Sequence, residues 1–135
     1  MTDSLPDADT TVEPLLAVAD LDRSVAFWTT KLGARVLTRW ESYALLALGR
    51  GRLHLALKGD PPPDRAVRLA PPAGPLDVAI GEVVLRVSDC LAVVAALQAR
   101  GVELLGPPAR PAWGGETRAF GRDPDGHLFE ISGPG

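Results

Sequence analysis

The feature that most restricts the fold of this chain is an internal repeat. The segment EPLLAVAD at residues 13–20 aligns with EVVLRVSD at residues 82–89, and each copy begins with Glu, ends with Asp and leads into an apolar segment closed by glycine. Such self-similarity indicates a structural unit that occurs twice. At 135 residues the chain is long enough for one domain with a core and too short for two independent domains. We therefore expect both copies to build one domain.

Each copy predicts a strand, a helix and three further strands. In the first copy, Asp20 or Asp22 can cap a helix that Gly33 ends, and Gly49-Arg50-Gly51 is a hairpin signal. In the second copy, Gly101 ends the helix and the DPDG sequence predicts a turn between the last two strands. The expected strands are 12–19, 34–41, 42–49, 52–59, 82–89, 102–108, 116–123 and 127–133, and the helices are 20–33 and 90–101.

A proline-rich segment at residues 59–80 separates the two copies. It carries six of the thirteen prolines, which exclude a helix and disfavour a central strand, so we expect a linker over the surface. The predicted class is α+β, with two βαβββ repeats forming a curled mixed sheet around a cleft and the helices outside. The predicted organisation is a disordered tail at 1–11 and a single domain at 12–132, formed by unit one (12–58), the linker (59–80) and unit two (81–132).

Four strands each place one ionisable side chain on the face that should line the cleft. Because side chains alternate along a strand, the apolar set of each strand should face its helix and the other set should face the cleft. His and Glu fill only eight of the 135 positions, so their recurrence in four equivalent strands indicates a site. The four residues are Glu13, His54, Glu82 and Glu130.

The double repeat, the phrase VADLDRSVAFW and the ending WGGETRAFGRDPDGHLFEI resemble the vicinal oxygen chelate superfamily over residues 12–132. This superfamily includes glyoxalase I, bleomycin-resistance proteins, fosfomycin-resistance enzymes, extradiol dioxygenases and methylmalonyl-CoA epimerase. The resemblance implies a cleft walled by both units. In metal-using members it holds a divalent ion through one residue from each of four strands, usually His, Glu or Gln, His and Glu.

Glu13, His54, Glu82 and Glu130 fall on these four ligand positions in order, and the sequence departs from the usual residues at three of them. Three carboxylates and one imidazole suit Mn, Mg or Fe(II) better than thiolate-favouring metals. The alternative is an ion-pair network without metal, because Arg86 lies on the same strand face as Glu82 and one guanidinium can neutralise two carboxylates.

Two functions therefore stay open. The first is a divalent-metal-dependent lyase, isomerase or dioxygenase acting on a small oxygen-chelating substrate, with Glu13 or Glu130 as the base. The second is a metal-free antibiotic- or metabolite-binding resistance protein, in which Trp40 and Trp113 stack on the ligand and the carboxylates attract a cationic group. Arg86 lies in the same cleft.

The remaining sequence features concern partners and compartment. The net charge of −3 predicts no binding to nucleic acid or to an anionic membrane and favours small, neutral or cationic partners. No segment resembles a signal peptide or a membrane span. A single cysteine, Cys90, allows no internal disulfide and is expected to be buried, so we expect a cytoplasmic protein. Unpaired sheet edges favour a homodimer, with the cleft formed within one chain or by exchange between two. His127, in a turn, is expected to be exposed.

Overall fold

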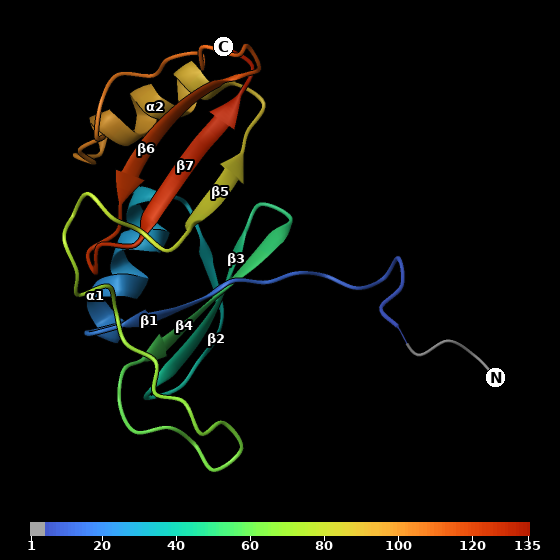
Figure 1. The fold of residues 1–135 in the computed structure, drawn as a ribbon, viewed down its shortest axis with the longest axis vertical. Helices are drawn as coiled ribbons and strands as arrows, with labels where there is room; N and C mark the ends of the chain where they lie inside the picture. Colours follow the sequence, from blue (N-terminus) through green and yellow to red (C-terminus); the bar gives the residue numbers. More distant parts are fainter. Residues whose placement is uncertain (1–4) are drawn as a thin grey trace.

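The computed structural model describes residues 5–135. In it, this α+β chain folds into two separate mixed sheets (Figure 1). Sheet A contains β1 (Leu15–Val18), β4 (Gly51–Leu57), β3 (Tyr43–Leu48) and β2 (Arg35–Arg39) in spatial order, with β1 parallel to β4 and the other pairs antiparallel. Sheet B contains β5 (Glu82–Arg86), β7 (Leu128–Gly133) and β6 (Thr117–Arg122), with β5 parallel to β7 and β6 antiparallel to it. The same strand order in both sheets confirms the predicted repeat.

Each unit carries one helix, which begins at an aspartate. In α1 (Leu21–Ala26), the Asp20 carboxylate accepts a hydrogen bond from the Arg23 amide at 3.0 Å. In α2 (Cys90–Ala99), the Asp89 carboxylate accepts one from the Ala92 amide at 3.1 Å. These are side-chain caps on otherwise unpaired N–H groups. A π-helical segment, η1 (Phe27–Lys31), extends α1 before Gly33, at φ 79°, ends it.

The two units share one apolar core. Helix α1 contacts β3 and β4, while α2 contacts β6 and β7. Trp28, from η1, is fully buried, and its ring lies 6.0 Å from that of Phe129 in β7. Phe27 adds a second contact with Phe129 at 6.3 Å. Because the helix of unit one packs on the sheet of unit two, the relative position of the units is set by buried contacts.

The DPDGH turn of unit two also forms hydrogen bonds with unit one. The Asp125 carboxylate accepts hydrogen bonds from the Ala19 amide at 2.8 Å and from the Arg23 side chain at 3.1 Å. His127 Nε2 is hydrogen-bonded to the Ala17 carbonyl oxygen at 2.7 Å. The expectation that His127 is exposed is therefore wrong, because the turn lies against β1 and the imidazole is half-buried there.

Two predicted strands differ from the structure. Residues 102–108 form no strand and approach β6 through single bridges at Leu104 and, further on, at Ala109, because Pro107 and Pro108 lack the N–H that a continuous ladder needs. Strand β1 begins at Leu15 rather than at residue 12, so Glu13 precedes the strand. The linker has no helix or strand, as predicted.

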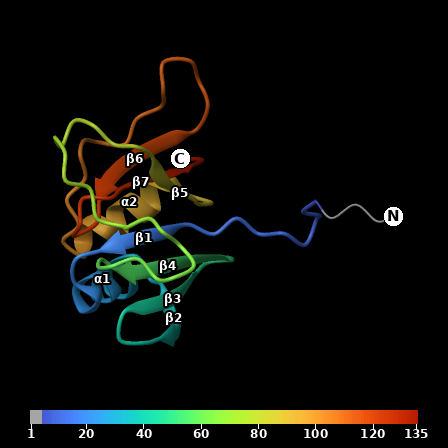
Figure 2. The ribbon, with the colours of Figure 1, turned by 60° about the horizontal axis from the view of Figure 1, so that its bottom comes forward.

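The chain outside the sheets has a simple course. The predicted tail at residues 1–11 lies partly outside the described residues. From residue 5 the chain lies away from both sheets and leads toward β1 (Figure 2). The linker passes β1 on its way from β4 to β5. Within residues 5–135 no helix is long and apolar enough to cross a membrane.

Candidate functional site

Strand alternation places the predicted ionisable residues as expected. On β4, Leu53 and Leu55 are buried in the core and His54 points to the opposite face. On β7, Phe129 and Ile131 are fully buried and Glu130 lies on the other side of the sheet. We call the sides of sheets A and B that carry His54 and Glu130 their cleft faces.

On sheet A, Glu13, His54 and Tyr43 form a hydrogen-bonded chain. His54 Nε2 lies 2.7 Å from Glu13 Oε1, and the Tyr43 hydroxyl lies 2.5 Å from His54 Nδ1. The Thr11 hydroxyl donates to the second oxygen of Glu13 at 2.8 Å. The hydrogen bond with His54, followed by that from Thr11, lowers the pKa of Glu13. Both imidazole nitrogens are thus engaged within the chain.

Tyr43 was missed in the sequence analysis, although a signal for it exists. In the antiparallel register of β3 and β4, Tyr43 pairs with Ala56, and His54 pairs with Leu45. Tyr43 is therefore the diagonal neighbour of His54 on the same face, within reach of a long side chain. Applying the alternation rule to β3 as well as β4 would have found it.

On sheet B, Glu82 and Glu130 form the second pair. Glu130 is 8% exposed, and its backbone pairs with Val84 of β5, two residues beyond Glu82. The pKa of Glu82 is raised to about 7. The main cause is partial burial of the Glu82 carboxyl group, followed by its hydrogen bond to Glu130 and the negative charge of Glu130. Two adjacent carboxyl groups disfavour double ionisation, so the Glu82 carboxyl group is partly protonated near neutral pH.

Arg118, not Arg86, is the cation nearest to this pair. Its Nη1 lies 3.9 Å from Glu130 Oε1, an ion-pair distance too long for a hydrogen bond. Arg86 forms its ion pair with Glu116. Arg86 does not neutralise the Glu82 and Glu130 carboxylates as expected, because it lies four residues along β5 from Glu82, a distance of about 13 Å. Arg118, in contrast, is two residues from the residue of β6 that pairs with Glu130.

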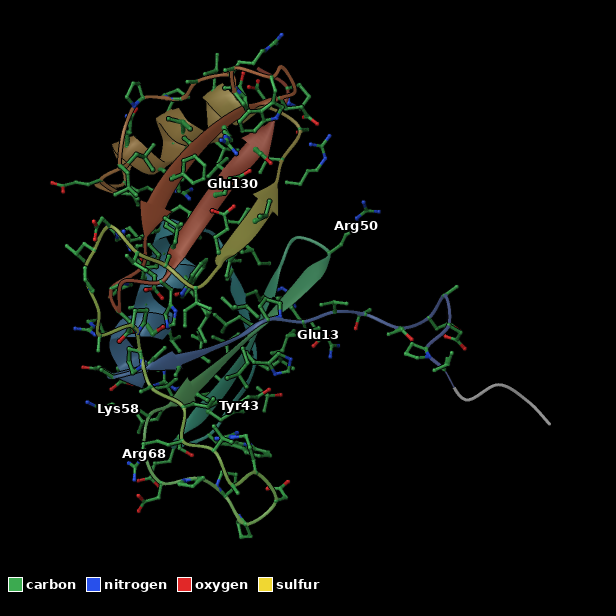
Figure 3. The ribbon with its side chains drawn as sticks, viewed as in Figure 1. Glu13, Tyr43, Arg50, Lys58, Arg68 and Glu130 are labelled. Atoms are coloured by element: carbon green, nitrogen blue, oxygen red, sulfur yellow. The ribbon has the colours of Figure 1, made fainter. Side chains whose placement is uncertain are left out.

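The four predicted metal ligands do not converge within one chain. Figure 3 shows Glu130 on sheet B and Glu13 beside the start of β1 on sheet A. Across residues 5–135, no group of three or more His, Cys, Asp or Glu side chains is arranged to hold a metal ion. The physical reason is that sheets A and B are separate, so Glu13 and His54 form one pair and Glu82 and Glu130 another. Within a single chain this donor set does not fit a four-ligand site.

Two cavities lie along the cleft side of the molecule, and the linker lines both. The first, about 710 Å³, lies between β6, residues 105–111 and linker residues 76–79, and we call it the sheet B cavity. The second, about 510 Å³, lies where the starts of β1 and β5 meet residues 70–74 and 78–81, all but the last of which belong to the linker. Both volumes fall in the range of small-molecule sites. The linker is therefore part of the cavity walls.

The two tryptophans predicted to contact a ligand are both exposed. Trp113 is 77% exposed, and the Arg118 guanidinium lies over its ring at 5.0 Å from the centroid. Trp40 is 70% exposed, and its ring lies 6.1 Å from that of Tyr43. Each tryptophan thus stands beside the cleft face of one sheet, next to a polar residue of that face.

The comparisons with known proteins identify the family of the chain. The model of the Glyoxalase/Bleomycin resistance protein/Dioxygenase superfamily matches residues 10–131. The chain belongs to this superfamily. That confirms the resemblance found in the repeat and in the DPDG ending. No curated protein sequence matches the chain.

Solved structures of the superfamily share the fold. A glyoxalase/bleomycin resistance protein/dioxygenase from Nocardioides has a TM-score of 0.77 at 24% identity, covering 96% of this chain and 86% of its own. A bleomycin-binding protein complexed with bleomycin gives 0.69 at 20% identity, covering 93% and 99%. FosX, a fosfomycin resistance protein from Listeria monocytogenes complexed with Mn(II), gives 0.67 at 17%, covering 96% and 93%. The fold of this chain is thus shared by one protein complexed with bleomycin and by another complexed with Mn(II).

Proposed function

We propose that this superfamily member is a small-molecule-binding protein that sequesters its ligand on the cleft face of sheet B and needs no resident metal to do so. The observation that carries the proposal is the sheet B cavity of about 710 Å³, which has an apolar wall and polar side chains together. The bleomycin-binding neighbour supports it as a precedent for binding on this fold.

The arrangement of the ionisable groups favours binding over metal chemistry within one chain. The Glu13 carboxylate and both nitrogens of His54 are already hydrogen-bonded, and the carboxyl groups of Glu82 and Glu130 interact with each other. In this proposal the chain's own groups orient the ligand: Trp113 offers an exposed aromatic face, and Arg118 offers hydrogen-bond donors.

Binding can be tested on the chain after dialysis against EDTA. Phenylphosphonate, benzyl alcohol and benzylamine are titrated separately while amide shifts and tryptophan fluorescence are followed. We expect at least one probe to shift amides of β6, to be recovered unchanged and to change the fluorescence of Trp40→Phe but not that of Trp113→Phe. If none of the three shifts any amide of sheet B at about 10 mM, where even weak fragments bind, the proposal is wrong.

A second candidate is a divalent-metal-dependent enzyme that acts as a homodimer. Equivalent positions of the two repeats carry the two donor pairs, which favours it, since two copies could bring Glu13 and His54 of one against Glu82 and Glu130 of the other. The proton that Glu82 partly holds near pH 7 is one that a bound cation would displace. A divalent ion would supply Lewis acidity to substrate oxygens, with Glu13 or Glu130 as base.

Elemental analysis after loading with Mn(II) and dialysis decides between the two candidates. The enzyme proposal expects about one ion per chain in the wild type and a large loss in Glu130→Gln, with Glu103→Gln, an exposed glutamate, as the matched control. Light scattering should show a dimer at the same concentration. Negligible metal in wild type and both variants would leave the metal-free binder alone.

A further inference from the structure

We propose that the sheet B cavity recognises a small organic anion, a carboxylate, phosphonate or phosphate monoester with an apolar body, through Arg110, Arg118 and Arg122. The inference rests on the proposed function, since it assigns a ligand class to the same cavity. It also reverses the expectation from the acidic composition, because the chain as a whole carries a net charge of −3.

The lining of the cavity combines positive charge with apolar surface. Three arginines are among its lining residues, and Asp77 is the one carboxylate among them within the described chain, 5–135. Phe120 and Leu105 supply the apolar part. An excess of positive charge in a partly enclosed space raises the local concentration of anions and disfavours cations.

Strand β6 places two of the arginines on either side of an aromatic residue. Ala119 and Gly121 are buried, while Arg118, Phe120 and Arg122 alternate with them on the cleft face. Residues i and i+4 of a strand on one face are separated by about 13 Å. The two arginines therefore flank Phe120 along the strand, and an anionic group bound by either of them keeps the apolar body of the ligand close to this residue.

The Arg118 guanidinium is held in position before any ligand binds, and it has unused hydrogen-bond donors. Its guanidinium carbon lies 5.0 Å from the ring centroid of Trp113 and 5.1 Å from that of Phe120, so two aromatic rings hold the group. Its ion pair with Glu130 has a distance of 3.9 Å and includes no hydrogen bond, and Glu82 interacts with it only through its charge. A planar guanidinium with unused donors fits the two oxygens of a carboxylate or phosphonate.

The other two arginines complete the cavity from different segments. Arg122 donates hydrogen bonds to the carbonyl oxygens of Gly126, at 3.1 Å, and of Leu76, which fixes the linker to β6 and leaves further N–H groups of its five. Arg110 is exposed and, among residues 5–135, has no hydrogen-bond or ion-pair partner. An anion in the cavity would supply the partner that Arg110 lacks.

A charge series on the EDTA-dialysed full-length chain tests the inference. Phenylphosphonate is compared with benzyl alcohol and benzylamine, which keep the ring and change the charge, by following amide shifts of β6 and residues 105–111. We expect phenylphosphonate to bind at least about tenfold more tightly than either, which is about 1.4 kcal/mol. Its Kd should rise as NaCl is increased from about 0.05 to 0.5 M, because salt screens the attraction.

Two variants and a control link the effect to the cavity. Arg110→Gln and Arg118→Gln should each raise the Kd about fivefold or more, since each loses a charge-assisted hydrogen bond. Arg35→Gln, on the exposed β2 of sheet A, should leave it unchanged. Arg110 lies in an exposed loop, so its variant keeps the test valid if Arg118→Gln does not fold. Dispersed amide spectra confirm folding.

The outcomes separate this inference from the function on which it rests. If benzylamine or benzyl alcohol binds β6 as tightly as phenylphosphonate, or if both arginine variants keep wild-type affinity, the anion assignment is wrong and the small-molecule binder stands. If no probe of any charge shifts the amides of sheet B, both proposals are wrong.

Discussion

Gly121, the penultimate residue of β6, is the position where a single methyl group should perturb the sheet B cavity most. A Cβ added there would lie 2.5 Å from Cζ of Phe129 and 3.0 Å from both of its Cε atoms. Normal carbon–carbon contacts are about 3.5–4.0 Å, so the overlap is roughly 1 Å. The backbone of Gly121 is not in the left-handed region, and the effect of Gly121→Ala is therefore steric.

The ring has little room to yield. Phe129 is fully buried, and its ring packs against those of Trp28 and Phe27. Overpacking of this kind costs about 1–3 kcal/mol of unfolding free energy. With an unfolding entropy of about 0.3 kcal/mol/K for a chain of this length, the Tm should fall by roughly 4–11 °C. The shift of β6 should also weaken any binding in the cavity, since Phe120 and Arg122 flank Gly121.

Urea unfolding followed by circular dichroism measures the cost, with Gly81→Ala as the control. A Cβ at Gly81 meets nothing within 4 Å and its φ is not left-handed, so its stability should stay within about 0.5 kcal/mol of wild type. Phe129→Leu removes the clashing ring, and the double variant with Gly121→Ala should be about 1 kcal/mol more stable than additivity predicts. Additive effects, or a Gly121→Ala protein as stable as wild type, would refute the steric argument.

Three further predictions follow from the described contacts. Because the folded-state pKa of Glu82, about 7, lies above its usual 4.5, its carboxyl group stabilises the fold fully below pH 4.5 and loses this contribution as the pH rises through about 7. In urea unfolding from pH 4.5 to 8, the free energy of unfolding of the wild type should decline relative to that of Glu82→Gln. Parallel pH profiles of the two free energies would contradict the prediction. Asp125→Ala should cost about 1–3 kcal/mol in the same assay, since it leaves the Ala19 amide without its acceptor, and a loss below about 0.5 kcal/mol would show that the turn does not hold the units together. The thiol of Cys90 is fully buried and burial raises its pKa, so a thiol reagent should modify it only in denaturant, and rapid reaction of the native chain would contradict the packing.

Much of the fold follows from local sequence patterns. The repeat, the aspartate caps, the glycine stops and the strand alternation are properties of neighbouring residues, and the structure reproduces them. The exceptions lie where local pattern meets a backbone constraint. Residues 102–108 have strand-like side chains, but Pro107 and Pro108 cannot donate to a ladder, so only single bridges form.

The candidate site could be predicted only up to the face on which each side chain lies. Alternation correctly assigned His54 and Glu130 to the cleft faces, because the period of two is fixed by the backbone. Which side chains then meet depends on register between strands and on packing between sheets. Tyr43 meets His54, and Arg118 rather than Arg86 approaches Glu130, because of registers that no single strand encodes.

The sequence by itself determined two copies of a strand–helix unit and a period-two division of each strand into core and cleft residues. Only the tertiary structure decided that the four predicted ligands form two separate pairs and that the linker and three arginines enclose a cavity beside β6. The physical reason is the range of the interactions. Caps, turns and alternation depend on residues a few positions apart, whereas a cavity depends on how sheets and loops distant in sequence pack against one core.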